Sequence, residues 1–430
     1  MEISNLYQLF RQHPVVTTDS RNIPSQSIFF ALKGDHFNGN SFALEALSKG
    51  AAFAVIDEPE FAANDKLILV DDVLLCLQQL ARHHRAQLKL PILAITGTNG
   101  KTTTKELIAA VLSKKFRIHF TQGNLNNHIG VPLTLLSITP ETKMAIIEMG
   151  ANHSGEIKKL CQIADPDFGI VTNIGKAHLE GFGSFEEIIK TKTELYDYLR
   201  GKGGKCFIHA DNPLLIQQAK DLEQISYGKS TDYFMPGELA STDYNLVVKA
   251  LFPKGWLYLK SKLIGDYNFE NVLAAACVGK YFEVDPLHIQ QALDEYTPSN
   301  NRSQLIQNEK NTLIMDAYNA NPTSMMLALS NFAGIKAERK CVILGDMLEL
   351  GEASESEHQK IVDFVESQTF EEVFLVGPQF KKTITQKVKK KFDNAELLSQ
   401  YLKTQTLENR FILVKGSRGI HLEKILGLLS

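Results

Sequence analysis

Short apolar runs alternate with stretches of helical periodicity through the middle of the chain. The apolar runs are rich in β-branched residues, as expected of buried strands. Strands are predicted at Ile92–Thr96, Ile118–Thr121, Met144–Met149, Gly169–Ile174 and Lys205–His209. Helices are predicted between them, at Thr103–Lys115, Ser154–Ile163 and Phe185–Leu199. Repeated strand–helix units of this kind predict a mainly parallel sheet with helices on both faces.

The C-terminal part repeats the same alternation and predicts a Rossmann-like layer, although it has no GxGxxG sequence. Its strands are predicted at Thr312–Met315, Cys341–Leu344, Glu372–Val376 and Phe411–Val414. Its helices are predicted at Thr323–Ala333, Ser356–Glu366, Lys381–Lys391, Ala395–Thr404 and Ile420–Leu429. The lysine cluster Lys387–Lys391 is then expected to be a solvated helix face.

The N-terminal part predicts a smaller α/β unit. Apolar runs at Ser27–Leu32, Ala52–Ile56 and Lys66–Val70 surround a helix at Ser41–Lys49, and a helix at Asp72–Leu88 leads onward. Before the C-terminal layer, alternating strands at Tyr244–Leu251 and Trp256–Leu263 predict an antiparallel edge or insertion, followed by helices at Asp266–Phe282 and Pro286–Tyr296. The polar stretch Thr297–Asn301 is predicted to be a linker. We therefore expect an α/β protein with three domains, at residues 1–85, 86–298 and 299–430.

Composition narrows the class of protein. A formal net charge of -3 argues against a nucleic-acid-coating protein. The five cysteines show no CxxC spacing, which is typical of reduced thiols in the cytoplasm. The N-terminus lacks a signal-peptide pattern, and no apolar run is long enough to span a membrane. These features predict a cytoplasmic protein without nucleic-acid or membrane partners, and we expect a monomer.

The stretch ILAITGTNGKTTTK, residues 92–105, carries the clearest chemistry. A strand runs into a glycine-containing loop, Gly97-Thr98-Asn99-Gly100, and then into Lys101-Thr102-Thr103 at the start of a helix. Glycines let backbone N–H groups approach phosphate oxygens, and the helix N-terminus favours an anion. The lysine can reach the β- and γ-phosphates, and the threonine hydroxyl can bind Mg²⁺. A bare GxxGKT also occurs in ordinary strand–helix turns, but the surrounding pattern favours nucleotide triphosphate binding.

Polar residues follow the ends of neighbouring predicted strands, where ligands collect in parallel sheets. Glu148 ends one strand, Thr172 and Asn173 end the next, and His178 follows in the loop. A carboxylate beside a phosphate loop is a natural Mg²⁺ ligand. A histidine is an unusual one, and a hydrogen-bonded loop histidine is the plainer interpretation of His178. From the residues alone we infer an enzyme that uses ATP or GTP and has a distal α/β domain.

Several motifs resemble the ATP-dependent Mur ligases of peptidoglycan synthesis. They are GTNGKTTTKE (97–106), the Glu148 strand, VTNIGKAHLEGFGS (171–184) and the pair Asn268 and Asn271. Four further stretches are similar to the member that joins D-alanyl-D-alanine to UDP-N-acetylmuramoyl-tripeptide. These are NLNNHIGVPLTLL (124–136), MDAYNANPTSM (315–325), LGDMLELG (344–351) and KGSRGIHLE (415–423). The resemblance spans all three predicted domains.

The resemblance implies ATP, two Mg²⁺ ions and a set of site residues. Thr102 and Glu148 would share the first ion, with Lys101 at the phosphates. His178 would contact the second ion, and Lys192 in KTKTELY would be carbamylated to give it an anionic ligand. The ATP contacts across the domain cleft would come from Asn268, Asn271, Arg302, Asp316, Asn319 and Asn321. The residues implied for the UDP-linked substrate are Ser20, Arg21, Asn126 and Asn127. The sequence departs from the family pattern at Tyr267, where histidine is common, and at Asn301-Arg302-Ser303, where Gly-Arg-Leu is usual.

The implied reaction forms an acyl phosphate from the tripeptide carboxylate, which the amine of D-alanyl-D-alanine then attacks. Two other hypotheses stay open on the sequence. One is a different Mur-type or folylpolyglutamate-type ligase, which the stretches at 315–325 and 344–351 disfavour. The other is a nucleotide switch, in which hydrolysis responds to a macromolecule rather than to two small substrates.

Overall fold

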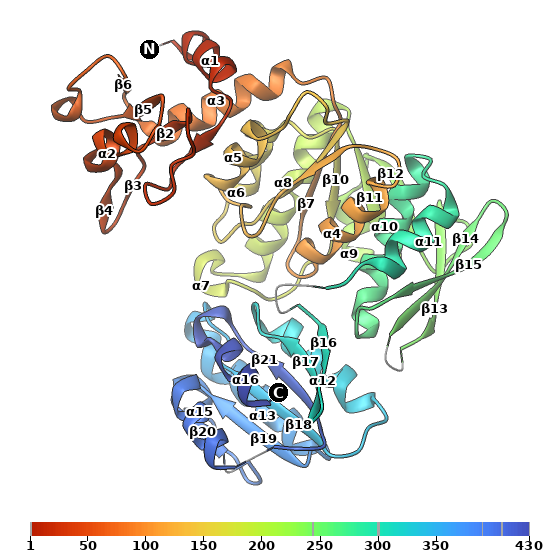
Figure 1. The fold of residues 1–430 in the computed structure, drawn as a ribbon. Helices are drawn as coiled ribbons and strands as arrows, with labels where there is room; N and C mark the ends of the chain where they lie inside the picture. The colour runs from red at the N-terminus through yellow and green to blue at the C-terminus, as the bar shows by residue number, and fades with distance from the viewer. Residues whose placement is uncertain (1, 243–244, 299–301, 389, 406, 430) are drawn as a thin grey trace.

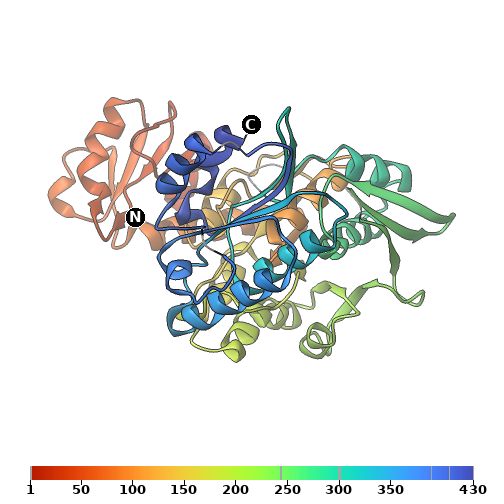
Figure 2. The ribbon, with the colours of Figure 1, turned by 90° about the horizontal axis from the view of Figure 1, so that it is seen from below.

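The computed structural model describes residues 2–242, 245–298, 302–388, 390–405 and 407–429. The start of the strand predicted at Tyr244 and the end of the linker predicted at Thr297–Asn301 lie outside these residues. Three sheets follow one another along the chain, each with its own helices (Figures 1 and 2). The predicted α/β class is confirmed.

The N-terminal sheet is parallel and has the strand order β1-β2-β5-β6. These strands are β1 (Val16–Thr17), β2 (Ile28–Phe30), β5 (Phe53–Ile56) and β6 (Leu67–Leu69), and a separate hairpin is formed by β3 (Lys33–Gly34) and β4 (Phe37–Asn38). The helical segments are α1 (Ile3–Gln12), η1 (Gly39–Phe42), α2 (Ala43–Ser48) and η2 (Pro59–Phe61). Helix α1 was not predicted from the sequence, because it buries only Leu6 and Phe10, four residues apart on one face.

The central sheet has nine strands in the order β15-β14-β13-β12-β11-β10-β7-β9-β8. Its strands are β7 (Ile92–Thr96), β8 (Ile118–Phe120), β9 (Met144–Glu148), β10 (Phe168–Val171), β11 (Lys205–His209), β12 (Glu223–Gly228), β13 (Met235–Ser241), β14 (Leu246–Phe252) and β15 (Gly255–Ser261). Pairing is parallel from β8 to β13 and antiparallel from β13 to β15, so the predicted antiparallel segment is an edge of this sheet.

Helices cover both faces of the central sheet. They are α3 (Val73–Gln87), α4 (Lys101–Leu112), α5 (Gly130–Leu136), α6 (Glu156–Ala164), α7 (Leu179–Phe182), α8 (Phe185–Lys202), α9 (Pro213–Gln218), η3 (Asp266–Asn268), α10 (Phe269–Tyr281) and α11 (Pro286–Glu295). Along β7, Ile92 and Ala94 join the core beneath α3, α5, α6 and α8, whereas Leu93 and Ile95 join the core beneath α4, α10 and α11. Because the side chains of β7 are buried alternately on the two faces of the sheet, its sequence is an uninterrupted apolar run.

The C-terminal sheet has the order β16-β17-β21-β18-β19-β20, and only the edge strand β16 is antiparallel. Its strands are β16 (Gln304–Gln307), β17 (Asn311–Asp316), β18 (Lys340–Gly345), β19 (Glu372–Val376), β20 (Lys390–Phe392) and β21 (Arg410–Lys415). Its helical segments are α12 (Pro322–Gly334), η4 (Gly351–Ala353), α13 (Ser354–Ser367), α14 (Pro378–Lys382), α15 (Ala395–Thr404), η5 (Arg418–Ile420), η6 (Leu422–Ile425) and α16 (Leu426–Leu429).

The helix predicted at Lys381–Lys391 is wrong. Helix α14 ends at Lys382, and the carboxylate of Glu366 accepts the backbone N–H groups of residues 386–388, which fixes a loop there. Lys390 then enters edge strand β20, with its ammonium 4.9 Å from the Phe374 ring centroid. The lysine cluster is therefore not a solvated helix face. Lysines on an edge strand discourage pairing with other chains.

The helix predicted at Ile420–Leu429 is also wrong over most of its length. His421 has a φ of +58°, in the left-handed region, and it separates η5 from η6. Only Leu426–Leu429 forms α-helix. Apolar spacing alone did not reveal this break, because Leu422, Ile425 and Leu429 are all buried from 3₁₀ and α-helical turns alike.

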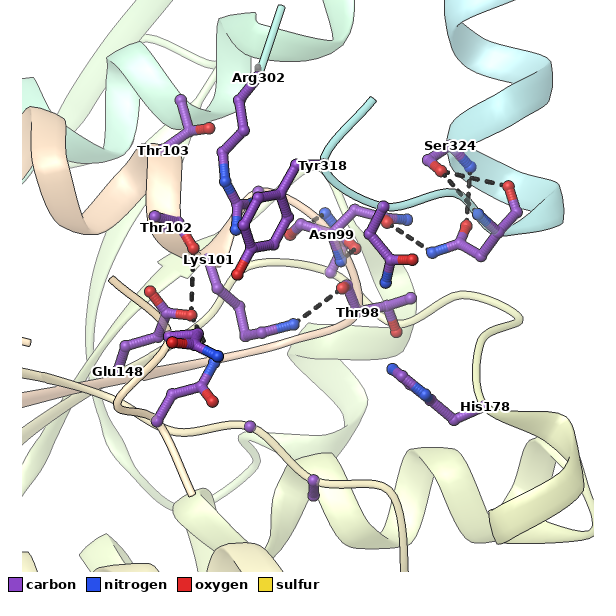
Figure 3. Close-up of a pocket in the computed structure, with 18 of the residues that line it drawn as sticks. Thr98, Asn99, Lys101, Thr102, Thr103, Glu148, His178, Arg302, Tyr318 and Ser324 are labelled. Carbon is purple, nitrogen blue, oxygen red and sulfur yellow. Dashed lines mark hydrogen bonds between the residues drawn. The ribbon is translucent and has the colours of Figure 1, made fainter. Parts of the chain in front are cut away.

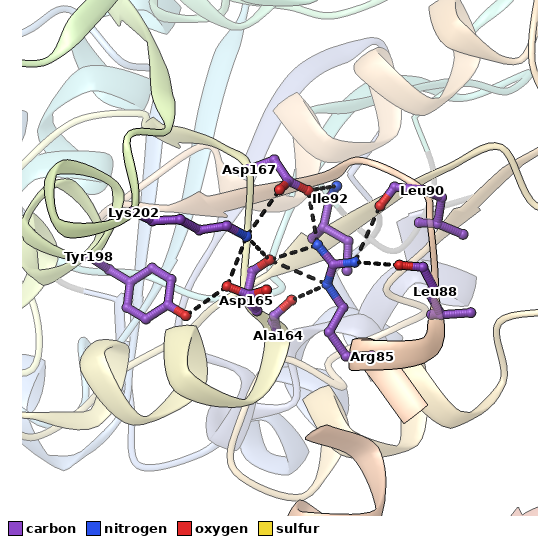
Figure 4. Close-up of polar contacts among 9 residues, drawn as sticks. All are labelled: Arg85, Leu88, Leu90, Ile92, Ala164, Asp165, Asp167, Tyr198 and Lys202. Carbon is purple, nitrogen blue, oxygen red and sulfur yellow. Dashed lines mark hydrogen bonds and ion pairs between the residues drawn. The ribbon is translucent and has the colours of Figure 1, made fainter. Parts of the chain in front are cut away.

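The end of α3 is fixed to the central domain by a buried arginine (Figure 4). The Arg85 guanidinium donates to backbone oxygens of Leu88, Leu90, Ala164 and Asp165 and to the Asp167 carboxylate. Asp167 also accepts the Ile92 N–H group at 2.9 Å, so one network joins α3, the C-terminus of α6 and the start of β7. The domain limit predicted at residue 85 thus falls within this hydrogen-bond network.

We expect Arg85→Ala to lower the free energy of unfolding by about 3 kcal/mol, because it leaves buried backbone carbonyls without their donor and removes one of the cationic partners of the Asp167 carboxylate. Arg82→Ala is the matched control, since Arg82 lies on the same helix but is exposed. Urea unfolding of both variants measures the difference. Equal stabilities for the two variants would contradict a structural role for this network.

Candidate active site

The loop between β7 and α4 can be built only with glycine at two positions. Gly97 and Gly100 have φ values of +138° and +77°. A Cβ at Gly97 would lie 2.1 Å from the Thr172 hydroxyl, and one at Gly100 would lie 2.7 Å from the Asn271 side chain. The loop is therefore packed closely while its backbone faces a cavity at the N-terminus of α4. Such a helix start favours an anion.

Lys101 is the first residue of α4 and its ammonium lies over the loop. It donates to the backbone oxygens of Gly97 and Thr98 at 2.8 and 2.9 Å (Figure 3). Burial lowers the pKa of Lys101 to about 8; the nearby Glu148 opposes this shift, and Arg302 adds to it. An anionic ligand such as a phosphate would stabilise the protonated form of this poorly solvated ammonium group.

Glu148, at the end of β9, lies against the start of α4. Its Oε1 accepts from the Thr102 hydroxyl at 3.1 Å and from the Asn126 amide at 2.8 Å. Its Oε2 is buried and has no hydrogen-bond partner among the described residues, although the Lys105 ammonium lies 3.6 Å away. The Thr102 hydroxyl and the Glu148 carboxylate thus offer hard oxygen ligands at the phosphate loop, as Mg²⁺ requires.

Two buried asparagines, Asn268 at the end of η3 and Asn271 on α10, line the same cavity. Asn271 donates to Asn268 Oδ1 at 2.8 Å and accepts from the Thr104 hydroxyl at 3.0 Å. Asn268 in turn donates to the backbone oxygen of Ile264 at 2.7 Å. The spacing of three residues places both amides on one side of the helix start, at the wall of the cavity.

The C-terminal domain closes the other side of the cavity. The Asn321 amide donates to Asn99 Oδ1 at 2.8 Å, which joins α12 directly to the phosphate loop. The Arg302 guanidinium lies over the Tyr318 ring, 3.6 Å from its centroid (Figure 3). Asp316 is paired with the buried Lys415 at 2.5 Å. A cation stacked on an aromatic ring is held in place without losing its N–H donors.

The resulting cavity has a volume of about 520 Å³ and is walled by both domains. Many of the residues expected at the ATP site line it: Thr98, Asn99, Gly100, Lys101, Thr102, Thr103, Glu148, His178, Asn268, Asn271, Arg302, Asp316, Asn319 and Asn321. Asn126 and Asn127, expected at the substrate, line it too. Asn127 also accepts the N–H groups of Ile129 and Gly130 at the start of α5, so part of its role is structural.

His178 lines this cavity, and Lys192 contacts Ala151 of the cavity wall. His178 Nδ1 contacts the carboxylate of Glu349, in the C-terminal domain. This contact lowers the pKa of Glu349. Lys192, on α8, is buried, and its ammonium donates to the Ala151 backbone oxygen at 3.2 Å. Burial, and next the charge of Lys101, lower the pKa of Lys192 to about 7. Within the described part of the chain, no cluster of three or more His, Cys, Asp or Glu residues is arranged to hold a metal ion.

Ser20 and Arg21 are not part of the cavity wall. They lie in the loop between β1 and β2, where the Arg21 guanidinium pairs with Asp19 at 2.8 Å and is 88% exposed. Their role at the UDP end of a substrate stays a prediction. An exposed guanidinium can bind a diphosphate.

Sequence reasoning missed several residues that the structure brings to the cavity. Tyr318 and Lys415 line it, and Lys105 lies beside Glu148. Tyr318 and Lys415 lie within stretches 315–325 and 415–423, which resemble the Mur ligases, so these motifs already pointed to both residues. Their contacts join positions far apart in the chain, such as Lys415 and Asp316, and no local pattern predicts such pairs.

The family models that match this chain follow one another along it. They are described as "Mur ligase family, catalytic domain" over residues 14–85, "Mur ligase middle domain" over residues 95–279 and "Mur ligase, glutamate ligase domain" over residues 301–418. Among curated relatives, the UDP-N-acetylmuramoyl-tripeptide–D-alanyl-D-alanine ligase of Bacillus subtilis is 35% identical, and the match covers 95% of this chain and 92% of the relative.

Solved structures agree over nearly the whole length. MurF from Acinetobacter baumannii has a TM-score of 0.87 and 28% identity, and the match covers 98% of this chain and 97% of the other. MurF from Thermotoga maritima, in complex with ADP, has a TM-score of 0.85 and 25% identity, with 96% of each chain covered. All three domains of the fold are therefore shared with enzymes of this kind.

Proposed function

The chain belongs to the Mur ligase family. From this premise we propose that it joins D-alanyl-D-alanine to UDP-N-acetylmuramoyl-tripeptide at the expense of ATP, in the synthesis of peptidoglycan precursors. The observation that carries the proposal is the shared cavity, in which the Asn321 amide from the YNANP stretch bonds to Asn99 of the phosphate loop at 2.8 Å. The phosphate donor and the C-terminal motif thus meet at one site.

Charge accounts for the order of the reaction. A carboxylate is a poor electrophile, so an oxygen of the tripeptide carboxylate first attacks the γ-phosphorus of ATP. The bond from that phosphorus to ADP breaks, ADP leaves, and the carboxylate becomes an acyl phosphate. The dipeptide amine then attacks the acyl carbon, the C–O bond to phosphate breaks, and inorganic phosphate and an amide are formed. Lys101 and Arg302 are suited to neutralise charge on the phosphoryl group, because both cations face the cavity.

The nucleotide would be held between two domains. Residues Gly97–Thr103 would surround its phosphates, with backbone N–H groups at the start of α4. Asn268 and Asn271 would lie at one side, and Arg302, Asp316, Asn319 and Asn321 at the other. Closure of the C-terminal domain on these groups would exclude water and align the reacting atoms.

Magnesium fits the phosphate loop on the chemistry of its donors. Thr102 and Glu148 would hold one ion, and the buried Glu148 Oε2, which lacks a hydrogen-bond partner among the described residues, supports this assignment. Bound there, Mg²⁺ would neutralise charge on the phosphates. His178 and a carbamylated Lys192 are proposed for a second ion. The lowered pKa of Lys192, about 7, supports carbamylation, since only the neutral amine combines with carbon dioxide.

The UDP-linked substrate would extend from the cavity to the N-terminal domain. Ser20 and Arg21 are proposed for its UDP end, and Asn126 and Asn127 for the part nearer the phosphate loop. Among the described residues, none of the helices has the length and apolar character needed to cross a membrane. We propose a cytoplasmic monomer that has small-molecule substrates and no nucleic-acid partner.

Release of phosphate tests the proposal with purified protein. It should require ATP, UDP-N-acetylmuramoyl-tripeptide and D-alanyl-D-alanine together, because phosphate leaves only after an acyl phosphate forms and an amine attacks it. Reactions that lack one component in turn are the controls. Release from ATP alone that is unchanged by either small substrate would contradict a ligase and favour a nucleotide switch.

A further inference from the structure

The segment Thr172–Leu179 connects the phosphate loop with the C-terminal domain. At its first end, the Thr172 hydroxyl donates to the Asn99 backbone oxygen at 2.6 Å. Asn173 accepts the Asn99 N–H group through its side chain and the Thr98 N–H group through its backbone oxygen, both at 2.9 Å. Gly175 N–H donates to the Thr98 hydroxyl at 3.0 Å. The position of this segment therefore sets the position of the phosphate loop.

The other end of the segment meets the C-terminal domain. His178 Nδ1 contacts the Glu349 carboxylate, and the backbone oxygen of Glu349 accepts the Glu180 N–H group at 3.4 Å. Lys176 lies 3.7 Å from the Glu357 carboxylate. The Leu179 side chain packs against the apolar core of the C-terminal domain as well as that of the central domain. Figure 3 shows His178 on the side of the cavity where Thr98 lies.

The two residues that meet at this contact share a costly backbone conformation. His178 has a φ of +51° and Glu349 a φ of +63°, and neither is glycine. Non-glycine residues are uncommon in this region because the Cβ crowds the backbone, and they concentrate at functional sites. Both conformations aim a polar side chain across the domain boundary. Apolar packing between the two domains does not require these polar contacts, because Leu179 already packs against both cores.

We propose that Glu349 is a positioning residue, which holds His178 when the C-terminal domain is docked and thereby fixes the Thr172–Leu179 segment against the phosphate loop. Docking of the C-terminal domain is in this way linked to the geometry of the phosphate site. The inference rests on the proposed function for its catalytic readout only. Glu349 is well suited to a test, since its side chain is 55% exposed and its truncation leaves no cavity.

The experiment compares Glu349→Ala, Glu349→Gln and the control Glu352→Ala. Glu352 is exposed and lies on the neighbouring turn η4. Glu349→Ala should lower kcat by ~10–100-fold, with less than about a 3-fold change in the KM for ATP, because misplacement rather than lost binding is the cause. Glu349→Gln keeps the length of the side chain and an oxygen beside His178 Nδ1, so it should retain most of the activity. Glu352→Ala should match the wild type.

Small-angle X-ray scattering with ADP alone gives a readout that does not depend on the ligase assignment. The Glu349→Ala protein should show a larger radius of gyration than the wild type, while Glu349→Gln and Glu352→Ala should not. The proposal would be overturned if Glu349→Ala had the same turnover and the same radius of gyration as the wild type. It would also be overturned if Glu352→Ala lost as much activity as Glu349→Ala. If the scattering changes as expected but no variant or wild-type protein forms the amide, the proposed function has failed and the positioning role stands.

Discussion

Replacing Lys101 by alanine should abolish ATP turnover while leaving the fold intact. The ammonium is the cation that lies over the phosphate loop, and it donates to the loop oxygens of Gly97 and Thr98. Removing one preorganised donor from an active site typically costs ~10²–10³-fold in kcat, and a charge at the transferring phosphoryl group should reach at least that range. The side chain is half-buried, so its loss should not unfold the domain.

Lys115→Ala is the control for this prediction, because Lys115 is an exposed lysine just beyond the far end of α4. Phosphate release measures turnover, and thermal melting checks the fold of both variants. A Lys101→Ala protein that keeps appreciable turnover would show that the loop at residues 97–103 is not the phosphate site. Loss of turnover in both variants would point to damage in the helix instead.

Lys192→Ala should also be nearly inactive, although the phosphate loop is untouched. If the carbamylated side chain supplies an anionic ligand, its removal should cost about 100-fold or more in activity. Lys192→Arg should fail as well, because a guanidinium keeps the charge but does not form a carbamate. Lys190→Ala is the matched control, two residues earlier on α8, with a side chain that is 72% exposed.

The pH dependence of Lys192 follows from its buried amine. Burial, and next Lys101, lower its pKa to about 7, so the amine is mainly neutral above that value and mainly protonated below it. Carbamylation consumes the neutral amine, and activity should therefore fall as the pH drops through about 7. A carbamate signal from ¹³C-labelled bicarbonate, present in the wild type and missing in Lys192→Arg, is the direct measurement. The hypothesis would be rejected if Lys192→Ala stayed active and the wild type gave no carbamate signal.

The local elements of the site were predictable because their signals lie within a few residues. The run at Ile92–Thr96 is β7 without any shift, since a strand buried on both faces has an uninterrupted apolar sequence. The glycines at 97 and 100 follow from the same stretch, because only glycine fits both the backbone angles and the close neighbours. Glu148 also lies where its position at a strand end suggested, against Thr102.

Features that depend on distant partners were not predictable. The segment Lys381–Lys391 is rich in lysine, a good helix former, yet the Glu366 carboxylate on α13 accepts the backbone N–H groups of residues 386–388 and fixes a loop. The burial of Arg85 could not be predicted locally, because its partners Ala164, Asp165 and Asp167 lie 79 to 82 residues away in the sequence. The contact of His178 with Glu349 required the arrangement of two domains.

The central claim is tested most directly by asking which amine accepts the acyl group. D-Alanyl-D-alanine, L-glutamate and diaminopimelate are each supplied separately with UDP-N-acetylmuramoyl-tripeptide, ATP and Mg²⁺, and the product is identified by mass. The amide of D-alanyl-D-alanine should form, and the other two amines should serve poorly, because a site built for a dipeptide leaves polar groups unpaired with the wrong amine. A product from L-glutamate together with none from D-alanyl-D-alanine would contradict the assignment, while an ATP-dependent amide ligase would still account for the phosphate loop.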